Sequence, residues 1–149
     1  YHNDVVKMLK KLIKENLFHV HQTFHDTTEI LNYLCDELID SDLATKAYKE
    51  DVFKREAVSA TSFMYGFAVP HSIEVSTKKS CISVLILDRS VKWGEFDVKF
   101  IILLGIRETD NHLLKLFFDW LSSIVANSKK FEQLLEVNNY EEFMKEIIA

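Results

Sequence analysis

The sequence contains few residues that interrupt regular structure: 3 glycines and 1 proline among 149 residues. Glycine and proline are the strongest local breakers of helices and strands. Their scarcity therefore predicts a chain made mostly of helices and strands with short connections. The chain is long enough, and at 48% apolar residues hydrophobic enough, to bury the core of one domain.

Cysteine and long apolar runs are also scarce, and acidic residues outnumber basic ones. The two cysteines, Cys35 and Cys81, lie in apolar segments without the spacing of a metal or redox motif, which is typical of buried thiols in a reducing cytosol. No apolar run approaches the roughly 18 residues of a membrane span, and "YHNDVVKMLKKLIKEN" is too charged for a signal peptide. The net charge of −5 argues against direct binding to nucleic acid or anionic membranes. These absences predict a cytoplasmic domain.

The apolar pattern of the rest of the sequence alternates between helix and strand. Helical spacing occurs at about 5–13, 26–39, 46–57, 110–126, 129–137 and 140–149. "CISVLIL" and "VKFIILLGI" are near-continuous apolar runs, typical of strands covered on both faces, and "DRSVKWGEFD" between them is predicted to be a polar connection. Buried strands interleaved with helices predict an α/β fold with a mixed, largely parallel sheet and helices on both faces.

The first helical segment is locally basic, with four lysines on an otherwise acidic chain, and the sequence begins with Tyr1 rather than methionine. We therefore expect residues 1–15 to form a connector or packing helix and residues 16–149 to form the domain. The same two features are expected of a module cut from the C-terminal part of a longer protein.

The single proline lies in "YGFAVPHS", residues 65–72. Pro70 stops the preceding strand, which places His71 at the carboxyl end of that strand, where functional groups gather in open α/β sheets. His112 follows the strand "VKFIILLGI" after a short loop and lies in the first turn of the long helix. If the two strands run parallel and close together, both imidazoles reach the same edge of the sheet.

A helix N-terminus offers unpaired N–H groups to an anion and favours a neutral imidazole. Two neutral imidazoles beside such groups suit phosphoryl transfer, in which one attacks phosphorus and the other donates to the phosphoryl oxygens. Arg55 is a third candidate, because a guanidinium binds two phosphate oxygens at once. Each of these residues also has an ordinary structural alternative: a hydrogen-bonded histidine for His71, a solvated helix start for His112 and a helix-face charge for Arg55.

The order of these residues resembles the fructose/mannitol-class (type 2) enzyme IIA domain of the bacterial phosphoenolpyruvate:sugar phosphotransferase system. The sequence elements that carry the resemblance are Arg55-Glu56, Thr61, "GFAVPH" at 66–71, Trp93 and "HLLKL" from His112 onwards. The resemblance extends from about Glu15 to the final helix. "SFMY" before Gly66 is bulkier than the glycine-rich stretch common in transport members.

The resemblance implies a role for each matching residue. His71 is expected to accept a phosphoryl group from the phosphocarrier HPr, His112 to stabilise that group and Arg55 to neutralise it. Thr61 and Ser72 are expected to help bind it, although Ser72 has the alternative of starting a turn. The resemblance implies no metal and no cofactor.

Two uses of the phosphoryl group remain open. In sugar-responsive transcription regulators and antiterminators, which carry such domains near their C-termini, phosphorylation is a signal. In transport systems the domain passes the group to a cysteine of a IIB domain during uptake of fructose- or mannitol-type sugars. "SVKWGEFDVKFIILLGI" and "YEEFMKEI" resemble the regulator-borne domains more closely, so we favour the regulatory role.

A different class of site, for zinc, is suggested by "HVHQTFH". His19, His21 and His25 share parity on a strand, so at least the first two can face the same way. No cysteine or carboxylate completes the set at convincing spacing, and we favour the alternative of a surface strand with incidental histidines.

Overall fold

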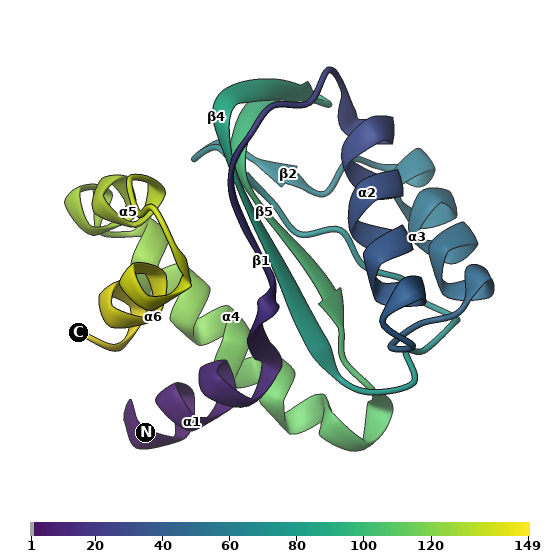
Figure 1. Cartoon of the computed structure of the whole chain (residues 1–149), viewed down its shortest axis with the longest axis horizontal. Coiled ribbons are helices and arrows are strands. Elements are labelled where there is room, and N and C mark those ends of the chain that lie inside the picture. Colours follow the sequence, from purple (N-terminus) through teal and green to yellow (C-terminus); the bar gives the residue numbers. More distant parts are fainter. Residues whose placement is uncertain (1) are drawn as a thin grey trace.

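The computed structural model describes residues 2–149 as a central sheet between two layers of helices (Figure 1). The N-terminal half contains α1 (His2–Leu12), β1 (Ile13–Gln22), α2 (Thr27–Asp40), α3 (Lys46–Val58), β2 (Ser62–Phe63) and β3 (Phe67–Ala68). The C-terminal half contains β4 (Cys81–Trp93), β5 (Phe96–Gly105), a 3-10 turn η1 (Glu108–Asp110), α4 (Asn111–Val125), α5 (Ser128–Leu135) and α6 (Tyr140–Ile148). The six predicted helical segments are confirmed.

The strands form one sheet in the order β1-β4-β5-β3-β2. β1 pairs with β4, and β3 with β5, in parallel, whereas β4 with β5 and β2 with β3 are antiparallel. A mixed sheet is therefore confirmed, although parallel and antiparallel pairings are equally frequent in the described residues. The parallel pairing of β3 with β5 is the one that the expected placement of His71 requires.

The predicted polar connection between the two apolar strands is wrong. β4 continues to Trp93 and β5 starts at Phe96, so these strands form a long hairpin in which Gly94 and Glu95 alone make the turn. Val91 and Trp93 are buried while Lys92 between them is exposed. The charged residues therefore occupy the solvent-facing positions of a strand. Gly94 has φ of +64°, which suits glycine in such a tight turn.

Alternate residues of β4 and β5 divide the core between the two faces of the sheet. One face carries Ile82, Val84, Ile86, Phe100, Ile102 and Leu104 and packs against α1, α4, α5 and α6. The other face carries Leu85, Leu87, Ile101 and Leu103 and packs against α2 and α3. Figure 1 shows these two helical layers on either side of the strands. Because both faces are covered, both strands are apolar almost throughout, as the sequence predicted.

α1 packs into the larger of these two layers, next to α4. Val5, Met8, Leu9 and Leu12 on one side of the helix are buried in the same cluster as Leu121 and Ile124 of α4. None of the helices described in residues 2–149 is long and apolar enough to cross a membrane.

Candidate functional site

His71 lies directly beyond the carboxyl ends of two parallel strands. β3 ends at Ala68, and after Pro70 the chain makes one more parallel bridge, between His71 and Leu104 of β5. The N–H of Leu104 donates to the carbonyl of Pro70 at 3.0 Å. The predicted position of His71, at a strand end in a parallel pair, is thereby confirmed.

The imidazole of His71 is oriented by the backbone just before it. Its Nδ1 lies 2.8 Å from the carbonyl oxygen of Val69. A carbonyl oxygen only accepts hydrogen bonds, so Nδ1 carries the ring proton and donates it to Val69. In the neutral ring this leaves the lone pair on Nε2, which is therefore the nucleophilic atom of this half-buried side chain.

A second layer of hydrogen bonds holds Val69 in place. The N–H of Val69 donates to the carbonyl of Thr61 at 3.1 Å. Thr61 is itself buried, and its N–H and hydroxyl both donate to the carboxylate of Glu56, at 2.5 and 2.7 Å. Glu56 thus positions His71 through Thr61 and Val69. The sequence showed Glu56 beside Arg55, but its role depends on a partner that only the fold brings close.

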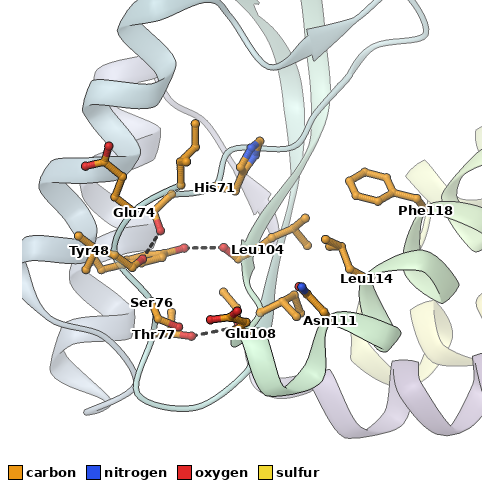
Figure 2. Close-up of a pocket in the computed structure, with 15 residues that line it drawn as sticks. Tyr48, His71, Glu74, Ser76, Thr77, Leu104, Glu108, Asn111, Leu114 and Phe118 are labelled. Carbon is orange, nitrogen blue, oxygen red and sulfur yellow. Dashed lines mark hydrogen bonds between the residues drawn. The ribbon is translucent and has the colours of Figure 1, made fainter.

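A cavity of about 420 Å³ opens next to His71 (Figure 2). Its walls come from α3, the loop after His71, the end of β5 and the start of α4, and they comprise Tyr48, His71, Ser72, Ile73, Glu74, Val75, Ser76, Thr77, Leu104, Gly105, Ile106, Glu108, Asn111, Leu114 and Phe118. In Figure 2, Leu114 and Phe118 of α4 lie across the cavity from the strand segment that carries His71. We call this space the His71 cavity.

Two buried hydroxyl groups fix the end of β5 at the floor of the His71 cavity. The hydroxyl of Tyr48 donates to the carbonyl of Leu104 at 2.6 Å, and that of Thr77 donates to the carbonyl of Gly105 at 3.1 Å. Burial raises the pKa of Tyr48 well above its ordinary value, so this phenol remains a proton donor throughout the physiological range. The backbone that pairs with His71 is therefore held by two side-chain hydrogen bonds.

Asp51 holds the loop that follows His71. Its carboxylate accepts the N–H groups of Ile73, Glu74 and Val75, at 2.7, 2.8 and 3.4 Å. Desolvation alone would raise the pKa of Asp51, but these three backbone hydrogen bonds outweigh it and lower the pKa below its usual value. Our sequence reasoning missed Asp51. An acidic residue next to Val52 on the buried side of α3 was the available signal.

The other site residues named from the sequence lie in different surroundings. The hydroxyl of Ser72, which does line the His71 cavity, donates to the carbonyl of Val75. Thr61 is outside the cavity lining, with its hydroxyl bound to Glu56. Arg55 is also outside, and its Nη1 donates to the carbonyl of Ser59 at 2.7 Å at the end of α3.

His112 is exposed in the first turn of α4, as expected, but the cavity is lined by its neighbour Asn111 and by Leu114 and Phe118. These three residues share a helix face that His112 does not. The structure thus brings His71, Ser72 and Asn111 to one cavity, and Asn111 is a polar lining residue that the motif did not indicate. Its two charged lining residues are Glu74 and Glu108, so no cationic side chain of residues 2–149 lines the cavity.

A comparison with known protein families decides what kind of domain this is. The family model described as phosphoenolpyruvate-dependent sugar phosphotransferase system, EIIA 2, matches residues 11–149. The chain belongs to this family. The resemblance recognised from Arg55-Glu56, "GFAVPH" and "HLLKL" is thereby confirmed over nearly the whole sequence.

Relatives of this EIIA 2 domain are much longer proteins. The transcriptional regulator ManR of Bacillus subtilis is 24% identical over 119 residues, which are 80% of this chain and 18% of the regulator. A multiphosphoryl transfer protein of Escherichia coli is 31% identical over 130 residues, 83% of this chain and 15% of that protein. The chain spans less than a quarter of the length of each of these two relatives.

Solved structures of similar shape confirm the fold. Enzyme IIA mannitol of Escherichia coli has a TM-score of 0.75 at 16% identity, covering 91% of this chain and 96% of that one. The nitrogen regulatory protein IIA-Ntr of Neisseria meningitidis has a TM-score of 0.74 at 19% identity, covering 93% and 97%. An α/β fold with a mixed sheet is thus shared with this EIIA 2 domain.

The zinc site considered from "HVHQTFH" is wrong. His19 binds Glu37 at 2.7 Å, His21 binds Asp88 and Asn138, and His25 binds Glu29, so the three imidazoles have separate partners. Across residues 2–149 no group of three potential metal ligands comes together. His21 has φ of +57°, which breaks the regular alternation on which the shared orientation depended.

Proposed function

We propose that this EIIA 2 domain is the phosphohistidine domain of a sugar phosphotransferase system and accepts a phosphoryl group on Nε2 of His71. The observation that carries the proposal is the 2.8 Å hydrogen bond from Nδ1 of His71 to the carbonyl of Val69. It leaves Nε2 as the free lone pair in a half-buried ring beside a cavity. The donor is the phosphohistidine of the carrier HPr.

The transfer is a displacement at phosphorus. The lone pair of Nε2 forms the new N–P bond while the N–P bond to the donor imidazole breaks and its electron pair returns to the donor. Nδ1 keeps its proton throughout, and the carbonyl of Val69 stabilises the positive charge that develops on the ring. The hydrogen bonds that link Glu56 to Thr61, Thr61 to Val69 and Val69 to the imidazole limit rotation of the ring. They therefore support a productive orientation of Nε2.

A protein donor is supported by the rim of the His71 cavity. Ile73 and Phe118 are large apolar side chains that line the cavity and remain 70% and 41% exposed. Exposed apolar groups beside a nucleophile suit transient contact with another protein. The carboxylates of Glu74 and Glu108 suit a partner with a basic contact surface and disfavour free anionic phosphate.

The matching family motif supports two helper roles in this proposal. Arg55 neutralises the phosphoryl group with the N–H donors that its single hydrogen bond to the carbonyl of Ser59 leaves available. His112, exposed one residue after Asn111 in the first turn of α4, stabilises the group when the donor is bound. Ser72 and Asn111 offer a hydroxyl and an amide from the cavity wall. Thr61 contributes indirectly, because it is bound to Glu56 and its carbonyl holds Val69.

We further propose that phosphorylation acts as a signal within a transcription regulator. The regulators of Bacillus subtilis that match 80% or more of this chain support that context. The alternative is a relay in which the group passes on to a IIB cysteine during sugar uptake. It is supported by the relatives named multiphosphoryl transfer protein, and by the fold neighbour solved in complex with phosphorylated enzyme IIB.

The test is incubation of the domain with phosphoenolpyruvate, enzyme I and HPr, followed by intact mass measurement. We expect one added phosphoryl group per chain, labile in acid and stable in base, absent in His71→Ala and retained in the control His25→Ala. Addition of a IIB domain then separates the two contexts, because only a relay domain loses its label rapidly to it. Normal labelling of His71→Ala would overturn the assignment of the site.

A further inference from the structure

A second cavity, of about 590 Å³, is lined by residues that directly follow those of the His71 cavity in two loops. Its walls come from the α1–β1 junction, the loop after α2, the segment entering β4 and the loop after β5. The lining residues are Lys11, Leu12, Lys14, Asn16, Leu17, Ser41, Leu43, Lys78, Lys79, Ser80, Cys81, Arg107 and Asp110. We call this space the basic cavity.

The charge of the basic cavity is opposite to that of the protein. Five of the 18 lysines and arginines line it, against one carboxylate, while the whole chain carries −5. The carboxylate, Asp110, accepts the hydroxyl hydrogen of Ser80 at 2.6 Å, and Ser80 in turn accepts the N–H of Arg107 at 2.9 Å. Asp110 therefore orders the wall of the cavity and leaves most of the positive charge uncompensated.

Several of the cations are available to a ligand. Lys11 and Lys79 are exposed and form no ion pair within residues 2–149. The amino group of Lys14 has only a 3.4 Å contact, with the carbonyl of Lys10. The ion pair of Lys78 is with Asp42, a carboxylate outside the lining that is itself exposed.

Arg107 is held so that part of its guanidinium stays free. Its Nη1 donates to the carbonyls of Thr77 and Lys78, and its backbone N–H donates to Ser80. A guanidinium has five N–H donors, so others remain for a ligand. Ser41 and Asn16 add neutral hydrogen-bonding groups to the same walls.

Like charges gathered from separate segments repel one another, so the positive charge of this cavity attracts anions. Lysine and arginine bind phosphate through short, charge-assisted hydrogen bonds. The volume lies within the range of small-molecule sites. We infer that the basic cavity binds a small molecule carrying two or more phosphate groups, a ligand distinct from the phosphoryl group on His71.

The basic cavity shares its wall with the His71 cavity. Thr77 and Gly105 line the His71 cavity, while the next residue, Lys78, and Arg107, two residues beyond Gly105, line the basic cavity. The guanidinium of Arg107 donates to the carbonyl of Thr77 across this wall. A ligand that engages Arg107 therefore contacts the loop that forms the floor of the His71 site.

The test is a titration of the ¹⁵N-labelled protein with inorganic pyrophosphate at low ionic strength. We expect saturable shifts of the amides of Lys78, Lys79, Ser80 and Arg107. The double substitution Lys11→Gln with Lys79→Gln should weaken binding about tenfold or more, because two charge-assisted contacts are lost. The control is Lys92→Gln with Lys129→Gln, which removes the same charge from exposed positions outside the cavity and should leave the affinity within about twofold.

Equal weakening in the two double variants would overturn the site, since it would show attraction by net charge alone. Amide shifts that do not saturate with pyrophosphate would also overturn the site. Saturation by poly-glutamate but not by pyrophosphate would do the same. The outcome is independent of the proposed function: His71→Ala should bind pyrophosphate normally, and the Lys11/Lys79 variant should still accept a phosphoryl group from HPr.

Discussion

The two cavities draw their lining from the same two loops but are built in opposite ways. The His71 cavity has buried polar supports, Tyr48 and Asp51 among them, and two acidic lining residues. The basic cavity has exposed lysines on two segments, the α1–β1 junction and the segment entering β4, and Lys11 and Lys79 form no ion pair within residues 2–149. Orientation of a nucleophile needs short hydrogen bonds from buried groups, whereas attraction of a mobile anion needs only a concentration of charge.

This difference predicts that substitutions around His71 cost stability and that substitutions of the lysines do not. The largest loss is expected for Asp51→Ala, which leaves the N–H groups of Ile73, Glu74 and Val75 without their carboxylate. We expect the free energy of unfolding to fall by about 3 kcal/mol, measured by urea denaturation. Asp40→Ala, at the exposed end of α2, is the control and should change it little.

The carboxylate of Asp51 should also make the stability of the fold depend on pH. Because the pKa of Asp51 is lower in the folded protein than in the unfolded chain, the unfolded chain binds more protons in acid. The stabilisation that ionised Asp51 gives the folded protein is therefore complete above the pKa of this residue in the unfolded chain, near 4. It is lost as the pH falls through the lower pKa of Asp51 in the folded protein. Stability between about pH 5 and pH 3 should fall less steeply in Asp51→Asn than in the native protein. Parallel curves would show that Asp51 contributes nothing to this slope.

Gly105→Ala tests the wall between the cavities and should have the next largest effect. A Cβ at Gly105 would lie 2.4 Å from Cγ2 of Thr77 and 3.3 Å from Sγ of Cys81. We expect a loss of about 2 kcal/mol in unfolding free energy from overpacking. The double variant with Thr77→Ser, which removes that methyl group and keeps the hydroxyl, should recover part of the loss. If the double variant recovers none of the lost stability, the strain lies elsewhere in the wall.

Tyr48→Phe should cost less, because one hydrogen bond is lost and the ring remains. The carbonyl of Leu104 then loses its 2.6 Å donor in a buried position. We expect about 1 kcal/mol of lost stability, together with slower phosphorylation of His71 as the end of β5 loosens. Tyr65→Phe, on an exposed ring, is the matched control and should be neutral in both measurements.

The smallest effect on stability is expected in the basic cavity. Lys11→Gln with Lys79→Gln should change the unfolding free energy by less than about 0.5 kcal/mol, because both side chains are exposed. Relief of repulsion should make the variant less sensitive to salt than the native protein, as measured by thermal unfolding between low and high ionic strength. A large destabilisation would mean that these lysines support the fold, and the contrast between the cavities would then fail.

Much of this architecture followed from local patterns. Helical periodicity predicted all six helices, and the apolar runs of β4 and β5 predicted strands covered on both faces. Pro70 predicted that the strand stops before His71, because proline restricts its own φ and the residue before it. These properties depend on neighbours within a few residues, so the amino-acid order alone determined them.

Other features depended on residues that the fold brings together from distant positions. The charged stretch from Asp88 to Asp97 became a hairpin because burial of Val91 and Trp93 outweighed its polar composition. The carboxylate of Asp51 reaches the N–H of Glu74, 23 positions later in the chain. The basic cavity joins Lys11 with Lys79 and Arg107. Sequence spacing carries no information about such pairs, so their chemistry was decided only when packing of the sheet and its two helical layers set the distances between them.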